Sequence, residues 1–308
     1  MSAWDTLFSA LRDPLADVCY LLDSALTRID LESECVTATF GSGHVARGDL
    51  LVGADGIGST TRAMLGIPGE GSYAGYVAFR GLEAEADLPS DLVELLSERF
   101  TFFGSPGMQM LCYLVPGPNG ELDPGRRRVN WVWYLNTSEK GMQGLMIGDS
   151  GRRFEHFLPP GELTVENTAA VTALAEATLP AQFVGLVEHS RVFLQPVFDL
   201  EPSRMVADHV VLVGDAAGTV RPHTASGTSK AFGDAAQLAH ALDGWSPPDA
   251  LPVRRLNDWE RQRLIHLEAV ARSGVRLAAQ SLLGTGGPEF RLAGTRDGGQ
   301  LRRHGRPR

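Results

Sequence analysis

The stretch VVLVGDAAGTVRPHTASGTSKAFGDA, residues 210–235, decides the fold that we expect for this chain. Its first part belongs to the apolar run 209–213, which is typical of a strand buried in a parallel sheet. Gly214 and Asp215 follow that run, and the pattern beyond the loop predicts a helix over residues 226–242. This order places Asp215 at the carboxyl end of a strand, where open α/β sheets bind their ligands.

The chemistry of this stretch suits a ligand that carries hydroxyl and phosphate groups. The Asp215 carboxylate can accept hydrogen bonds from a sugar-like chain, and free amides at a helix start near Ser226 attract negative charge. Pro222 fixes the loop that leads to this helix start. The alternative is purely structural, because small residues such as Ala225 and Gly227 also serve close packing.

A second segment, LLVGADGIGSTTR at residues 50–62, repeats this arrangement earlier in the chain. The apolar run 49–54 predicts a parallel strand that is buried on both faces. Asp55 and Gly56 end the run, and Ser59 is expected to cap a short helix. A lone acid at a strand end is more often a turn residue than a ligand. Two such acids in order favour a shared site.

We expect an α/β protein with two domains. One domain is discontinuous and Rossmann-like, built from residues 1–72 and 191–283. It holds both motifs and an antiparallel meander with strands at 26–31 and 35–40. The other domain, residues 73–190, is predicted to be a mixed β-sheet that is inserted into the first domain.

The inserted domain carries its own strand and helix signals. Its clearest strands are predicted at residues 76–80, 108–115 and 129–135. A helix is expected over 168–178, with Asn167 as its cap. After the inserted domain, the last helix is expected to run from Arg254 to about Leu283. The glycine-rich basic tail, residues 284–308, is predicted to be disordered.

One strand of the inserted domain offers candidate substrate residues. Asn130 and Tyr134 point to one face of this strand, and Trp131 and Trp133 point to the other. The first pair is a candidate substrate wall, although an aromatic strand that packs against helices is equally compatible with the pattern. His223 is a candidate base, because histidine titrates near neutrality. A hydrogen bond that only anchors the loop is an equally good explanation for His223.

Composition and charge exclude several classes of protein. The chain has 308 residues with 28 basic and 37 acidic side chains, and the net charge of −9 argues against a nucleic-acid partner. Cys19, Cys35 and Cys112 form neither a disulfide framework nor a zinc pattern, and no metal site is expected. The chain shows no export signal and no run of 18 apolar residues, which indicates a cytoplasmic protein without a membrane span.

In this order the two motifs resemble those of the FAD-dependent aromatic hydroxylases, the single-component flavoprotein monooxygenases related to p-hydroxybenzoate hydroxylase. The segment at 50–62 is similar to the family's Asp-Gly motif, and the segment at 210–235 is similar to its Gly-Asp motif. The similarity extends from about Trp4 to Leu283. Together, RPHTASGTSKA, QMLCYLVPG and VNWVWYLN look most like the hydroxylases of 2,6-dihydroxypyridine and 6-hydroxynicotinate.

The resemblance implies a role for individual residues. Asp215 would bind the ribitol chain of FAD, and the backbone from Ala225 to Thr228 would face the pyrimidine edge of the flavin. The inserted domain, residues 73–190, would bind the substrate through Asn130 and Tyr134, and His223 would be catalytic. The implied cofactor-binding residues are Asp55, Gly56 and Arg62 near the pyrophosphate, and Gly214, Asp215, Ala216, Pro222, Ala225, Ser226, Gly227 and Thr228. The chain departs from the more frequent family motif at Gly218, Ala225 and Ser229.

The implied activity is hydroxylation of a small aromatic or N-heterocyclic ring that already carries a hydroxyl group. In the family, NAD(P)H reduces FAD and the reduced flavin activates molecular oxygen. A base that ionises the ring hydroxyl speeds the reaction. The resemblance is compatible with a homodimer.

Family members also open with a strand, a GxGxxG turn and a helix for the ADP half of FAD, and this chain shows no such unit. Its near match at residues 41–46 lies in a predicted hairpin. Because the segment from Trp4 to Leu7 resembles an internal segment of the family, we expect roughly a hundred residues to be missing before it, and weak FAD binding. The alternatives are an inactive flavoprotein remnant that acts by binding, and a hydrolase that uses Asp215 and His223 with an unidentified nucleophile.

Overall fold

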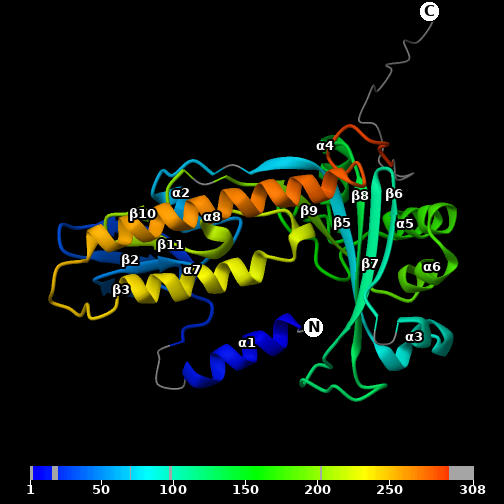
Figure 1. Ribbon diagram of the computed structural model, residues 1–308, viewed down its shortest axis with the longest axis horizontal. Helices are drawn as coiled ribbons and strands as arrows, with labels where there is room; N and C mark the ends of the chain where they lie inside the picture. The colour runs from blue at the N-terminus through cyan, green and yellow to red at the C-terminus, as the bar shows by residue number, and fades with distance from the viewer. Residues whose placement is uncertain (1–2, 16–19, 70, 97–98, 202, 291–308) are drawn as a thin grey trace, which may run out of the picture.

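The computed structural model describes residues 3–15, 20–69, 71–96, 99–201 and 203–290. A five-stranded sheet lies at one end of an elongated molecule, and two smaller sheets lie at the other end (Figure 1). The helices are α1 (Trp4–Arg12), α2 (Thr60–Met64), α3 (Ser90–Leu96), α4 (Glu139–Leu145), α5 (Val165–Thr178), α6 (Ala181–Glu188), α7 (Gly227–Ala241) and α8 (Val253–Ala279), with 3-10 turns η1 (Asp13–Leu15), η2 (Glu85–Asp87), η3 (Gly214–Ala216) and η4 (Pro222–Thr224). The strands are β1 (Leu26–Leu31), β2 (Val36–Phe40), β3 (Val45–Gly48), β4 (Leu51–Gly53), β5 (Ser72–Ala84), β6 (Thr101–Ser105), β7 (Met108–Val115), β8 (Arg128–Asn136), β9 (Phe193–Asp199), β10 (Val206–Ala207) and β11 (Val210–Leu212).

The two smaller sheets confirm the predicted meander and the parallel pair of motif strands. Strands β1, β2 and β3 form an antiparallel meander, and β11 lies between β10 and β4. Strand β11 runs parallel to β4, with Leu212 opposite Gly53. The ends of both motifs therefore meet at one edge of this sheet, as the sequence predicts.

Strand β4 differs from the expectation that it is buried on both faces. Val52 is 44% exposed, whereas all three residues of β11 are buried. Among the described residues, β4 has a neighbouring strand on one side only. Gly53 fits here because a Cβ atom would come within 2.8 Å of side-chain atoms of Leu212 and Thr61.

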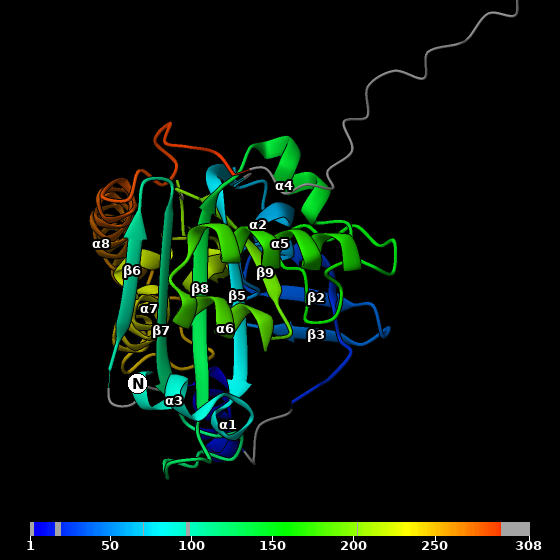
Figure 2. The ribbon, with the colours of Figure 1, turned by 90° about the vertical axis from the view of Figure 1, so that its right-hand side faces the viewer.

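The large sheet has the strand order β6-β7-β8-β5-β9, and each neighbouring pair is antiparallel. Helices α5 and α6 cover one face, and α7 and α8 lie behind the sheet (Figure 2). Strand β9 pairs with β5 and so belongs to this sheet. The sheet therefore extends to Asp199, beyond the boundary predicted at residue 190.

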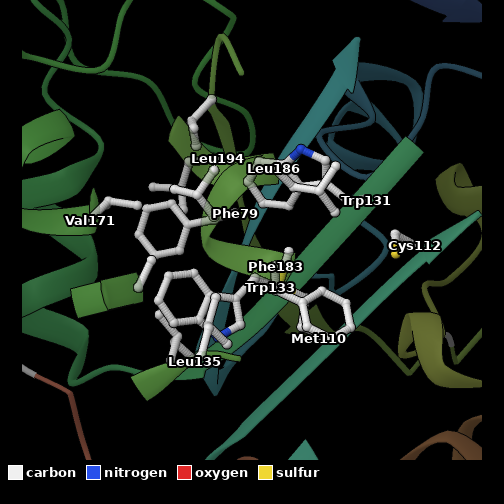
Figure 3. Packing of buried hydrophobic residues seen from close by; sticks show 14 of the residues in the cluster. Phe79, Met110, Cys112, Trp131, Trp133, Leu135, Val171, Phe183, Leu186 and Leu194 are labelled. Carbon is white, nitrogen blue, oxygen red and sulfur yellow. The ribbon is translucent and has the colours of Figure 1, made fainter. Parts of the chain in front are cut away.

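The face of the sheet under α5 and α6 holds the main hydrophobic core. Trp131 and Trp133 are fully buried there and pack among Phe79, Met110 and Phe183 (Figure 3). Tyr134 belongs to a separate cluster on the opposite face. The structure thus confirms the predicted alternation along β8.

Two details at element ends differ from the sequence prediction. The cap of α5 is Thr164 and not Asn167, because the Thr164 side chain accepts a hydrogen bond from the Asn167 amide. Helix α8 ends at Ala279.

The first part of the predicted disordered tail has a defined place. Gly284 N donates to Asn136 Oδ1 and Phe290 N donates to Asn136 O, so residues 284–290 lie against the end of β8. Disorder is therefore the wrong prediction for these residues, because the polar end of β8 holds their backbone. Residues 291–308 and Cys19 lie outside the described residues. Across the described ranges, no helix combines the length and the apolar character that crossing a bilayer requires.

Candidate active site

Asp215 lies in η3, just beyond the carboxyl end of β11. Its side chain is exposed, and no hydrogen bond or ion pair joins it to the described residues. The protein around the carboxylate still desolvates it and raises its pKa, while the charge of Lys230 opposes this shift. Asp215 is therefore a carboxylate with its acceptor positions available to a ligand.

The start of α7 lies in the same loop and has an uncapped first turn. No side chain among the described residues caps it, because Ser226 Oγ donates back to Thr224 O. The helical hydrogen bonds begin with Lys230 N to Ser226 O, which leaves the preceding amides free. A Cβ atom at Gly227 would meet no atom within 4 Å, so there is open space beside these amides.

Ala225 occupies an unfavourable backbone conformation just before this helix start. Its φ angle is +51°, in the left-handed region that favours glycine. The residue is exposed, and Pro222 fixes the opposite end of η4. The arrangement costs about 1 to 2 kcal/mol and directs the chain into α7.

A buried charge network below this loop was not predicted from the sequence. Asp234 accepts hydrogen bonds from Gly214 N at 3.0 Å and Arg263 Nε at 2.6 Å. Lys230 Nζ lies 3.2 Å from Asp234 Oδ2 and donates to Gly214 O at 2.7 Å. Lys230 and Asp234 are both almost fully buried. The network fixes the residue directly before Asp215, and the spacing of Lys230 and Asp234 by one helical turn was its only sequence signal.

Asp55 has a different environment from Asp215. Its carboxylate accepts hydrogen bonds from Ser59 Oγ at 2.5 Å, Thr61 N at 2.9 Å and Thr61 Oγ1 at 3.0 Å. Burial acts to raise the pKa of Asp55, but these hydrogen bonds outweigh it and the pKa is lowered. Asp55 therefore anchors the start of α2, where Ser59 is the predicted cap.

Arg62 joins the two motif loops. Its guanidinium donates to Ala216 O at 2.7 Å, to Ile57 O at 2.7 Å and to Gly69 O at 3.2 Å, and the residue is buried. Among the predicted residues of the first motif, which are Asp55, Gly56 and Arg62, Gly56 is the one with open space beside it. It has a φ angle of +76°, and a Cβ atom there would meet nothing within 4 Å.

His223 lies at the other end of the loop, against the inner face of the large sheet, which is the face that carries Tyr76 and Tyr134 and lies opposite α5 and α6. Its Nδ1 lies 2.8 Å from Gln109 Oε1 and its Nε2 lies 3.0 Å from Tyr76 Oη. Its ring centroid is 4.6 Å from that of Tyr134. The structure thus brings together His223 and Tyr134, both predicted site residues, and adds Gln109 and Tyr76, which the sequence did not single out.

The surroundings of His223 favour a neutral imidazole. Burial and then the charge of Arg221 lower its pKa to about 4. Because a carboxamide oxygen only accepts, Nδ1 carries the proton, and Nε2 accepts from the Tyr76 hydroxyl. Burial raises the pKa of that hydroxyl, so it stays protonated. Both ring nitrogens of His223 are therefore already engaged.

A partly buried ion pair between Arg221 and Asp199 lies next to this cluster. Arg221 donates to Asp199 through Nε at 2.9 Å and Nη2 at 2.7 Å, and its guanidinium lies 5.5 Å from the centre of the Tyr76 ring. Asp199 also borders a cavity of about 1410 Å³ beside α8. Asp215 and His223 do not line that cavity.

Asn130 is the predicted site residue that lies away from His223. It shares the inner face of the sheet with Tyr134, but the two are separated by four residues of β8, or about 13 Å. Its partners across the strands are Leu82 and Tyr113.

The lowered pKa of His223 predicts a specific acid dependence of stability. In the folded protein the His223 imidazole stays neutral down to about pH 4, whereas in the unfolded chain it binds a proton near pH 6.5. The contribution of the neutral His223 to the free energy of unfolding is therefore fully present above pH 6.5 and is lost as the pH falls toward 4. We expect this loss to be about 2 kcal/mol larger for the wild type than for His223→Gln. Urea unfolding of both proteins at pH 7.5 and 4.5 measures it, and equal losses would contradict the burial of a neutral ring.

The chain resembles known proteins in sequence over most of its length. A family model described as FAD binding domain-like matches residues 73–199. The chain is 29% identical to 2,6-dihydroxypyridine 3-monooxygenase of Paenarthrobacter nicotinovorans, over 94% of this chain and 72% of that protein. It is 26% identical to 6-hydroxynicotinate 3-monooxygenase of Bordetella bronchiseptica, over 77% of this chain and 55% of that protein.

Fold comparison leads to the same class. The solved structure of 2,6-dihydroxypyridine-3-hydroxylase from Arthrobacter nicotinovorans matches with a TM-score of 0.82 and 28% identity, over 94% of this chain and 72% of that one. The fold and the two motif loops are therefore similar to those of the FAD-dependent aromatic-ring monooxygenases. Within that class it is similar to the enzymes named for hydroxylated pyridines, and it spans between about half and three quarters of their length.

Proposed function

We propose that the chain is an FAD-dependent monooxygenase that hydroxylates a hydroxylated aromatic or pyridine ring. One observation carries this proposal. A single loop, residues 214–227, connects a free carboxylate and an uncapped helix start with the cluster around His223. The loop thus joins a surface suited to a flavin cofactor with an aromatic surface suited to a ring substrate.

The residues of the loop fit the flavin half of FAD. Asp215 would accept hydrogen bonds from the ribitol hydroxyls, and the amides of Gly227 and Thr228 would donate to the pyrimidine edge. The buried Thr224 Oγ1 has no hydrogen-bond partner among the described residues, as expected of a site that a ligand completes. Gly56 leaves open space where the first motif faces the cofactor. FAD would supply the two-electron reduction and the activation of oxygen.

The cluster on the sheet would orient the substrate. Gln109 and Tyr76 hold the His223 ring in one orientation and one tautomer. A base with a pKa of about 4 is weak at neutral pH, so these contacts favour an orienting role over proton abstraction. Tyr134, which lies against His223, would form part of the wall beside the ring.

The remaining partners follow from the same proposal. NADH or NADPH would be the reductant and molecular oxygen the second substrate. We also propose that the enzyme is cytoplasmic and that two copies of it form a homodimer.

Labelled oxygen tests the proposed reaction. The full chain is incubated with FAD, NADH or NADPH and one of three rings, namely 2,6-dihydroxypyridine, 6-hydroxynicotinate and salicylate, under ¹⁸O₂. We expect a product with one labelled oxygen atom from at least one ring, and NAD(P)H oxidation that the same ring accelerates. If no ring accelerated NAD(P)H oxidation or gained a labelled atom, the proposed hydroxylase would be contradicted.

Asp215 provides a test of cofactor binding that does not depend on turnover. Asp215→Ala removes a charge-assisted hydrogen bond to the ribitol chain, which costs on the order of 1.5 to 3 kcal/mol, or about ten-fold or more in FAD affinity. Flavin fluorescence titration measures the effect. Asp208→Asn, in the turn between β10 and β11, is the matched control and should leave the affinity unchanged. Equal affinities of Asp215→Ala and the wild type would remove Asp215 from the cofactor site.

A further inference from the structure

The chain forms a tight turn directly after α8, at residues 281–287, which we call the α8 turn. Three of its residues have positive φ angles, namely Leu282 at +52°, Gly284 at +67° and Gly286 at +78°. A leucine rarely adopts this conformation, because its Cβ atom crowds the neighbouring carbonyl oxygen. Contacts with the rest of the protein must therefore hold the α8 turn in its shape.

Asn136, at the end of β8, supplies two of these contacts. Its Oδ1 accepts a hydrogen bond from Gly284 N at 2.9 Å, and its Nδ2 donates to Leu282 O at 2.9 Å. Asn136 is only 2% exposed, so water competes little for either bond. Asn136 also lies directly opposite Tyr76 in the pairing of β8 with β5. One buried side chain thus fixes the α8 turn beside Tyr76.

The α8 turn forms one wall around the Tyr76 ring. Leu283 is fully buried in the same cluster as Tyr76 and Tyr134. A Cβ atom at Gly284 would clash with Ala74 O and would lie 3.3 Å from Tyr76 Cδ1, so only glycine allows this close approach. The α8 turn therefore restricts the positions that the Tyr76 ring can take.

Strand β5 is irregular just before Tyr76, where it meets the α8 turn. Its register with β9 shifts at this point, and Gly75 has a φ angle of +86°. A Cβ atom at Gly75 would lie 3.3 Å from Gly284 Cα, so the two glycine backbones pack closely. Irregularities of this kind redirect a neighbouring side chain. The side chain concerned is that of Tyr76, whose Oη lies 3.0 Å from His223 Nε2.

We propose that Asn136 and the α8 turn position the substrate site, because they fix Tyr76 and Tyr76 in turn fixes the His223 ring. The role of His223 toward a ring substrate rests on the proposed function. Asn136 and Gly284 are positioning residues, since they act through Tyr76. The substrate site thus depends on residues 281–287, which lie outside both motif loops.

Two glycines of the α8 turn provide a matched pair of variants. Gly284→Ala places a methyl group against Ala74 O and Tyr76, whereas a Cβ atom at residue 286 meets nothing within 4 Å. Both Gly284→Ala and Gly286→Ala force an alanine into a positive φ angle, so they share this source of strain. Only Gly284→Ala should disturb Tyr76.

The titration of His223 reports on Tyr76 without any turnover. In NMR spectra of the full chain, the His223 signal is the one that His223→Gln lacks. Burial lowers the pKa of His223 to about 4, so the wild-type signal should stay constant between pH 5 and 7. In Gly284→Ala and Asn136→Ala a displaced Tyr76 admits water, and the pKa should rise toward its usual value of about 6.5. Gly286→Ala should behave like the wild type.

Turnover separates positioning from cofactor binding. With a ring that the wild type hydroxylates, Gly284→Ala and Asn136→Ala should lower kcat about ten- to a hundred-fold. FAD affinity should stay unchanged, because Asp234 holds the loop before Asp215. Leu283→Met, which nearly keeps the side-chain volume, should retain more of the rate than Leu283→Ala.

The outcomes distinguish positioning from a purely structural role. An unchanged His223 pKa in folded Gly284→Ala and Asn136→Ala would overturn the proposal, and so would equal shifts in Gly284→Ala and Gly286→Ala. If Gly284→Ala does not fold, Asn136→Ala and Leu283→Ala provide the same test. A shifted pKa in a protein whose wild type hydroxylates no ring would keep the positioning of His223 and remove the proposed hydroxylase.

Discussion

Asp234→Ala is expected to lower the free energy of unfolding by about 3 to 5 kcal/mol. The substitution leaves the buried Lys230 ammonium and the Arg263 guanidinium without their shared carboxylate. It also leaves Gly214 N without its acceptor. A loss of this size is a large fraction of the stability of a typical domain, about 5 to 15 kcal/mol. Urea unfolding followed by tryptophan fluorescence measures it.

Two variants show whether the effect comes from the buried charges. Asp258→Ala removes an exposed acid of α8 that pairs with Arg261, and it should cost less than about 1 kcal/mol. Asp234→Asn keeps an acceptor for Gly214 N and should give an intermediate loss. If Asp234→Ala cost no more than Asp258→Ala, the network would not be what holds the loop before Asp215.

His223→Ala is expected to slow ring hydroxylation about a hundred-fold or more and to leave FAD affinity within a factor of two. The variant removes the partner of Tyr76 Oη and Gln109 Oε1, so both side chains lose their fixed orientation toward the substrate. Asp215 and the start of α7 keep their own support from Asp234 and Lys230. Product formation and flavin titration on the same preparations separate the two effects.

The pH dependence separates an orienting histidine from a catalytic base. A neutral His223 with a pKa of about 4 produces no titration of the rate near pH 6.5. His223→Gln, which keeps a donor and an acceptor, should recover part of the rate lost in His223→Ala. A rate step near pH 6.5 in the wild type that disappears in His223→Gln would contradict the orienting role and favour proton abstraction.

The sequence predicted those features that depend on neighbouring residues. The apolar runs, the Ser59 cap and the limits of α7 follow from local patterns, and the structure confirms them. The alternation along β8 predicted correctly that Tyr134 faces away from the two tryptophans. These signals depend on near neighbours in the sequence, with a period of two residues in strands and of three to four in helices, so they predict structure without knowledge of tertiary contacts.

The contacts that give each site residue its role join distant parts of the chain. Arg62 and Ala216 are 154 residues apart, and Gln109 is 114 residues from His223. In the sequence, Asp55 and Asp215 are both acids at the end of a strand. In the structure, Ser59 and Thr61 donate hydrogen bonds to the Asp55 carboxylate, whereas no described residue does so for Asp215. Only the fold distinguishes a carboxylate that anchors a helix from one that is open to a ligand.

Titration of the full chain with FAD tests the central claim most directly, because it requires no knowledge of the substrate. We expect weak but saturable binding of one flavin per chain, with a perturbed visible spectrum near 450 nm, as is typical of a flavin in a protein site. Asp215→Asn should weaken this binding about ten-fold or more. An unchanged flavin spectrum, with all FAD passing freely through an ultrafiltration membrane that retains the protein, would contradict the assignment of the loop as a flavin site.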